Sequence, residues 1–134
     1  MNQRGFATLE VILMIVVIGI LATIAIPRFA NITAAANTAK IQADLSTIDT
    51  AISISVVEGN TPSELSDLED YIKDAKSLEP PTGKCYIDGE IENVPTGGYK
   101  ITTPDGEEDL RATLDNKTVK YFSKVKISDP TPTP

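Results

Sequence analysis

The chain of 134 residues contains no histidine and only one cysteine, Cys85. Zinc sites and Cys–His nucleophiles depend on these two residue types, so the composition argues strongly against both. A single cysteine also forms no disulfide within its own chain. We therefore expect Cys85 to be a small, half-buried strand residue, with an intermolecular bond or a modified thiol as the alternative.

Catalytic constellations are missing as well. The sequence has no glycine-rich phosphate loop and no serine beside a suitable base, which predicts a protein that is not an enzyme and has no cofactor. Acidic residues cluster beside a glycine turn at Asp105 and at residues 107–109, and calcium prefers such oxygen ligands. Their spacing is not that of an EF-hand loop. We expect a solvated acidic turn and no metal site.

Charge is distributed unevenly along the chain. The sequence has 19 acidic and 12 basic residues, a net charge of −7, and every acidic residue except Glu10 lies at Asp44 or later. An acidic C-terminal part argues against nucleic acid as a direct partner. It predicts a well-solvated domain behind an apolar N-terminal region.

The N-terminal region contains one long apolar run. Residues 6–26 would span about 31 Å as a helix, which matches the hydrocarbon core of a bilayer. Arg4 precedes the run, and the positive-inside rule keeps that end in the cytoplasm. A carboxylate, Glu10, lies inside the apolar run, where an unpaired charge is costly.

This N-terminal sequence resembles the signature of type IV pilins and pseudopilins. The family pattern is a short basic leader ending in glycine, here Gly5, then a phenylalanine, here Phe6, and a glutamate five residues into the mature chain, here Glu10. A long apolar helix follows, interrupted by a glycine and a proline that match Gly19 and Pro27. The resemblance covers roughly residues 1–55. Many members read Thr-Leu-Ile before the glutamate, whereas this chain reads Ala-Thr-Leu.

The resemblance implies a structural subunit that is processed and then polymerised. A prepilin peptidase and methyltransferase would remove residues 1–5 and methylate the new amine of Phe6. Glu10 would pair with that amine on a neighbouring copy and so set the register of each subunit, and the helix would unwind between Gly19 and Pro27 in the filament. The implied partners are the chain itself, the pilus assembly machinery and, before assembly, the cytoplasmic membrane. The implied destination is an extracellular pilus.

Other interpretations stay open at this point. A pseudopilin of a type II secretion or DNA-uptake machine has the same N-terminal half, and a membrane-anchored binding module that never polymerises is a further alternative. The apolar run is also compatible with a secretory signal cut near residues 34–36, or with an uncleaved signal anchor. Neither of these last two readings explains Glu10 or the Gly5–Phe6 pair.

Beyond the apolar run, the periodicity predicts the rest of an α+β fold. Apolar residues recur on one helix face at Ile41, Leu45, Ile48 and Ile52, which predicts an amphipathic helix over residues 28–57. It follows the hydrophobic segment at residues 6–27, which would serve as transmembrane and assembly helix. The two segments are predicted to form one helix from about Leu9 to Val57, with a kink at Pro27.

A connector at residues 58–83 is predicted to hold a short helix near 62–75. Residues 84–128 then show the period of an antiparallel sheet of three to five strands, which packs on the long helix. The predicted strands are Lys84–Ile87, Glu90–Val94, Gly98–Thr103, Leu110–Leu114 and Thr118–Ile127. Residues 129–134 form a proline-rich tail.

Lysines gather in the last predicted strand, at Lys117, Lys120, Lys124 and Lys126. Such a basic strand could meet the acidic stretch Glu64–Asp74 of a neighbouring subunit. A solvated edge that resists aggregation is an equally good interpretation.

Overall fold

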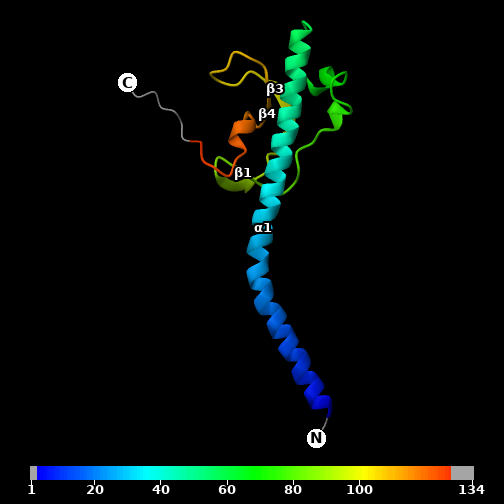
Figure 1. The fold of residues 1–134 in the computed structure, drawn as a ribbon, viewed down its shortest axis with the longest axis vertical. Coiled ribbons are helices and arrows are strands. Elements are labelled where there is room, and N and C mark those ends of the chain that lie inside the picture. The colour runs from blue at the N-terminus through cyan, green and yellow to red at the C-terminus, as the bar shows by residue number, and fades with distance from the viewer. Residues whose placement is uncertain (1–2, 128–134) are drawn as a thin grey trace, which may run out of the picture. The chain divides into compact units, whose positions relative to one another are not determined.

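The computed structural model describes residues 3–127 and opens with one long helix, α1, over Gln3–Val57 (Figure 1). The helix ends where the sequence predicts, before Gly59, but it begins six residues earlier than the predicted Leu9. It continues through Gly19 and Pro27 as helix. The chain divides into two compact units, Met1–Ile32 and Thr33–Pro134, and α1 belongs to both.

The N-terminal unit consists of α1 alone. Its large apolar side chains are exposed in the single chain, and α1 contains a stretch long and apolar enough to cross a membrane.

The C-terminal unit is built on the second half of α1. The predicted face is correct, because Ile41, Leu45, Ile48 and Ile52 are all buried. They pack in one cluster with apolar side chains from the strands and from the end of the described chain, chiefly Cys85, Ile87, Ile101, Ala112, Leu114 and Phe122. A small sheet has too little core to be stable alone, so the helix completes it.

Four strands form two separate antiparallel hairpins. In the first, β1 (Lys84–Ile87) pairs with β2 (Glu90–Asn93); in the second, β3 (Tyr99–Thr102) pairs with β4 (Arg111–Leu114). The α+β prediction is confirmed, and each of these strands lies within one or two residues of its predicted bounds. The expected single sheet is instead two hairpins.

A two-residue turn, Asp88-Gly89, joins β1 to β2. Asp88 and Gly89 both have positive φ, at 49° and 85°, as a two-residue hairpin turn requires. Gly89 also has no room for a side chain, because an added Cβ would lie 2.9 Å from the backbone nitrogen of Lys126.

The predicted strand Thr118–Ile127 is wrong. Residues 119–121 form a short 3-10 helix, η3 (Val119–Tyr121), and the following residues are irregular. Burial does not alternate along this segment: Phe122 is fully buried, whereas residues 124–126 are all exposed, with Val125 at 72%. Burying the large ring of Phe122 outweighs the strand propensity of its neighbours.

The predicted helix near 62–75 is also wrong as a continuous element. Two 3-10 turns take its place, η1 (Leu65–Leu68) and η2 (Ala75–Ser77). Asp67, the third residue of η1, caps its start, because the Asp67 carboxylate accepts the backbone N–H groups of Ser63 and Glu64 at 2.9 and 3.1 Å. These bonds hold the pKa of Asp67 below its usual value, with Ser63 the larger cause.

Candidate functional site

The N-terminal half of α1 is the candidate functional site because it presents apolar surface that nothing else within residues 3–127 covers. Residues 11–27 carry no charge, and their large side chains are roughly half to two-thirds exposed, such as Val17 at 47% and Ile26 at 68%. A stretch of exposed apolar surface this long marks contact with lipid or with other protein. The structure of the single chain therefore leaves this half of the helix incomplete.

Glu10 lies directly before this uncharged stretch. Its side chain is exposed and forms no ion pair with any of residues 3–127. Arg4 lies six residues earlier, which places it on a different face and about 9 Å away along the helix axis. The counter-charge that Glu10 needs in an apolar environment must come from outside the residues that the structure describes.

Gly5 and Phe6 lie in the first turns of α1. Phe6 is 71% exposed, and a Cβ placed on Gly5 would meet nothing within 4 Å. No other described part of the chain covers either position. Thr8 stabilises the same turn, since its hydroxyl donates to the Arg4 carbonyl at 2.9 Å.

Gly19 and Pro27 are placed inside the helix, without a break in it. Pro27 has no N–H, so the carbonyl of Thr23 loses the donor that a regular helix would supply. The hydroxyl of Thr23 is directed elsewhere, to the Ile20 carbonyl at 2.6 Å. The segment between Gly19 and Pro27 has fewer helix bonds and lower intrinsic helix propensity than its neighbours.

The remaining candidates lie in the C-terminal unit. Cys85 is a strand residue as predicted, but it is fully buried instead of half buried. Burial raises the pKa of its thiol, with a smaller contribution from Glu92. No group of acidic or thiol side chains within residues 3–127 has the arrangement of a metal site.

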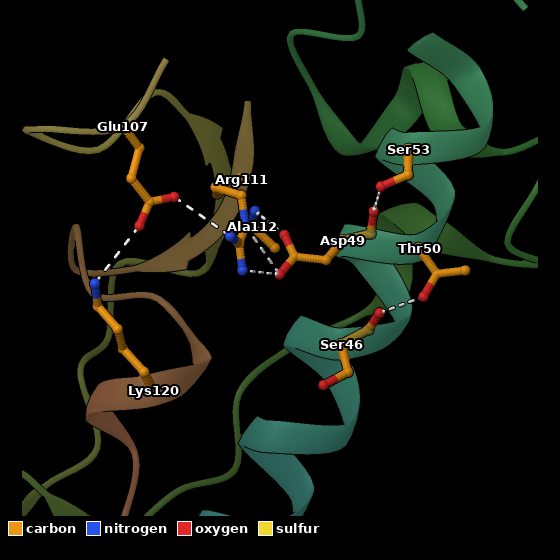
Figure 2. A network of polar contacts seen from close by, with 8 residues as sticks. All are labelled: Ser46, Asp49, Thr50, Ser53, Glu107, Arg111, Ala112 and Lys120. Carbon is orange, nitrogen blue, oxygen red and sulfur yellow. Dashed lines mark hydrogen bonds and ion pairs between the residues drawn. The ribbon is translucent and has the colours of Figure 1, made fainter. Parts of the chain in front are cut away.

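Of the acidic cluster, Glu107 is engaged with cations (Figure 2). Its carboxylate lies 3.3 Å from the Arg111 guanidinium and 3.6 Å from the Lys120 ammonium. The four lysines also lie outside the strands β1–β4, contrary to the prediction, and Lys120 lies in η3. Lys117 pairs with Asp115 at 3.1 Å, and Lys124 lies 5.3 Å from the centre of the Tyr86 ring.

One polar network was missed by sequence reasoning. Asp49 projects from α1 toward β4, as Figure 2 shows, and accepts the backbone N–H of Ala112 at 2.7 Å and the Arg111 Nη2 at 3.0 Å. Asp49 is the first cause of the raised pKa of Arg111. The network holds the second hairpin against the helix. A carboxylate one residue after the buried Ile48 was the available signal, because that position borders the apolar face.

A second link joins the same helix to β3. Tyr99 donates its hydroxyl to Asp44 Oδ2 at 2.7 Å, and Lys40 pairs with the same carboxylate. The pKa of Tyr99 is raised, first by burial and then by this hydrogen bond. Both links therefore fix the second hairpin to the helix.

Comparison with known proteins relates the whole chain to filament subunits. Fimbrial protein Q of Moraxella bovis is 30% identical over 126 residues, which is 94% of this chain and 78% of that protein. The type IV narrow pilus major component of Thermus thermophilus is 40% identical over 58 residues, 43% of this chain and 50% of that protein. Type II secretion system core protein G of Klebsiella michiganensis is 28% identical over 109 residues, 77% of this chain and 75% of that protein. No family model and no solved structure matches.

A small α+β unit on a helix long and apolar enough to cross a membrane, together with these relatives, defines the class of pilin-like proteins. The chain belongs to the type IV pilin family. It is a structural subunit, not an enzyme.

Proposed function

We propose that the chain is cleaved after Gly5, methylated on the amine of Phe6 and polymerised into an extracellular pilus. The observation that carries the proposal is the unpaired carboxylate of Glu10 on an exposed apolar helix. Cleavage creates a positive charge four residues from Glu10. In a bundle of such helices, the amine of one copy neutralises the carboxylate of the next.

Two free-energy terms explain why the subunit waits in a membrane and then assembles. Each large apolar side chain removed from water contributes about 1.5–3 kcal/mol, so the N-terminal helix is not stable in water alone. Transfer from lipid to a helix bundle yields little, because lipid is already apolar. Extraction from the membrane therefore needs energy from the assembly machinery, and the finished filament persists in water.

The orientation of the precursor follows from the charges that border the apolar stretch. Arg4 and the initiator amine stand before it, and only Arg28 stands close after it. The excess of positive charge before the apolar stretch keeps the N-terminus in the cytoplasm, where the peptidase acts on the Gly5–Phe6 bond. The acidic C-terminal unit is then placed outside.

The test is filament yield from Glu10→Gln and Glu10→Ala chains in a strain that lacks its own copy of the gene. Both variants are expected to accumulate in the membrane and to give few or no sheared filaments. Glu92→Gln is the matched control, because it removes an exposed carboxylate from β2. Normal filaments from Glu10→Ala would refute the role of the carboxylate.

Mass analysis of the mature chain tests the processing step separately. The expected chain begins at Phe6 and carries one methyl group on its amine. A chain that still begins at Met1 would contradict the cleavage and would favour a membrane-anchored module that never polymerises.

A pseudopilin is the second candidate, favoured by the match to the secretion protein over 77% of this chain. Deletion of the gene distinguishes the two functions. Loss of surface fibres favours the pilin, whereas loss of secretion or DNA uptake without a loss of fibres favours the pseudopilin.

A further inference from the structure

Two oppositely charged surfaces lie on the C-terminal unit, and ion pairs within residues 3–127 neutralise each of them only in part. The acidic segment, residues 64–76, has five acidic residues and two lysines, a net charge of −3. The basic segment, residues 115–127, has four lysines and one aspartate, a net charge of +3.

Each segment has exposed charged side chains that form no ion pair within residues 3–127. Residues 124–126 read Lys-Val-Lys and are all exposed, and neither lysine forms an ion pair with any of residues 3–127. Val125 between them is 72% exposed. On the acidic segment, Asp70 and Asp74 are exposed and likewise form no ion pair with the part of the chain that the structure describes.

The two segments lie on opposite sides of the C-terminal half of α1. Figure 1 shows η1 and η2 in green on one side and the chain that follows β4 in orange on the other. One chain therefore cannot bring its own two segments together. A second copy can, and each copy then keeps one acidic and one basic segment free for further copies.

We propose that the basic segment of one subunit docks on the acidic segment of the next subunit in the filament. Such a contact joins two different surfaces, so it does not close into a dimer and instead propagates as an open helical array. Val125 supplies an apolar centre and the lysines a charged rim, the usual arrangement of a protein interface. This inference rests on the proposed polymerisation and names the surfaces that the C-terminal units would use.

Charge reversal and charge exchange test the contact in the full chain, expressed in a strain without its own copy. Lys124→Glu with Lys126→Glu is expected to lower filament yield by roughly tenfold or more, since like charges opposed across an interface are strongly unfavourable. Adding Asp70→Lys and Asp74→Asn to the same chain is expected to restore filaments. Asparagine is chosen at position 74 because it tolerates the φ of 58° found there.

The matched control is Lys84→Glu with Lys100→Glu, which changes net charge by the same amount on exposed positions of β1 and β3. It is expected to keep normal yield. Normal filaments from the Lys124 and Lys126 reversal would overturn the inference, as would failure of the exchange to restore them.

Cross-linking gives a second readout that does not depend on charge. A chain with Asp70→Cys and Lys126→Cys, treated with an oxidant, is expected to give a ladder of covalent oligomers from sheared filaments. Each single variant is expected to give none, and Cys85 is buried and does not take part. Monomers alone from the double variant would overturn the inference.

The two proposals fail in different ways. If the unaltered chain forms no filaments, or if Glu10→Ala still forms them, the proposed assembly is wrong. If the unaltered chain forms filaments that depend on Glu10 but ignore both the charge reversal and the cysteine pair, only the docking surfaces are wrong.

Discussion

The two units of this chain differ in the solvent exposure of their apolar side chains. In the N-terminal unit they are exposed, as Ile18 is at 66%, whereas in the C-terminal unit Ile41, Leu45 and Phe122 are fully buried. The described residues of the first unit form one helix, whereas the second unit has an apolar core and polar links from α1 to both hairpins. The C-terminal unit buries an apolar core within the described residues, whereas the N-terminal unit leaves its apolar side chains uncovered there.

The largest expected effect comes from shortening one large apolar side chain to alanine in each unit. Phe122→Ala is expected to lower the free energy of unfolding of the C-terminal unit by about 3–5 kcal/mol, because it leaves a large cavity. Ile18→Ala is expected to leave that free energy unchanged. Denaturant titration of the full chain in detergent micelles measures both, with alkylation of the buried Cys85 thiol as the reporter of opening. Equal losses from the two variants would contradict the contrast.

The polar links of the second unit come next in size. Asp49→Ala is expected to cost about 1–3 kcal/mol, because it leaves the Ala112 N–H without its acceptor. The same titration measures the loss, and Glu92→Ala is the control, since it removes an exposed carboxylate. A loss no larger than that of the control would show that the Asp49 network does not hold the hairpin to α1.

A substitution at Gly89, in the turn between β1 and β2, is expected to lower stability by a smaller amount. Gly89→Ala forces a side chain into a φ of 85° and against the Lys126 backbone, which is expected to cost about 1–2 kcal/mol. Gly97→Ala is the control, because a Cβ there meets nothing within 4 Å. Thermal unfolding of both variants measures the difference. Equal melting temperatures would mean that the C-terminal segment moves away at no cost.

The smallest effect is a pH dependence at Asp67. Its pKa is lower in the folded chain than its usual value, so its contribution to stability is present above about pH 4. That contribution is lost as the pH falls through the unfolded pKa toward the folded one. The melting-temperature difference between the unaltered chain and Asp67→Ala should therefore narrow from pH 7 to pH 3. Ser77→Ala, which removes no titratable group, should show a constant difference, and a constant difference for Asp67→Ala would refute the linkage.

The sequence predicts the elements that depend on repeating local patterns. The helix face at Ile41, Leu45, Ile48 and Ile52 follows from the period and is found as expected. The two-residue turn at Asp88-Gly89 fills the gap between the strands predicted at Lys84–Ile87 and Glu90–Val94. Both signals are local, because each side chain or dihedral is specified by residues close to it in the chain.

Tertiary competition explains what the sequence did not predict. Phe122 is buried where the strand Thr118–Ile127 was predicted, and its burial depends on contacts with the helix and the hairpins. The Asp49 to Ala112 bond joins residues 63 positions apart, so no local pattern specifies it. At the candidate site, Glu10 and the apolar run are found exposed on α1, but the cleavage at Gly5–Phe6 and the unwinding at Gly19 and Pro27 remain predictions.

The lone thiol of Cys85 has a practical consequence for imaging. It is shielded in the core with a raised pKa, so it reacts slowly with maleimide dyes while the fold is intact. A cysteine introduced at an exposed position such as Glu92 would then be the sole reactive handle on each subunit. Any polymer of this chain could be labelled at one fluorophore per copy without first removing the natural residue.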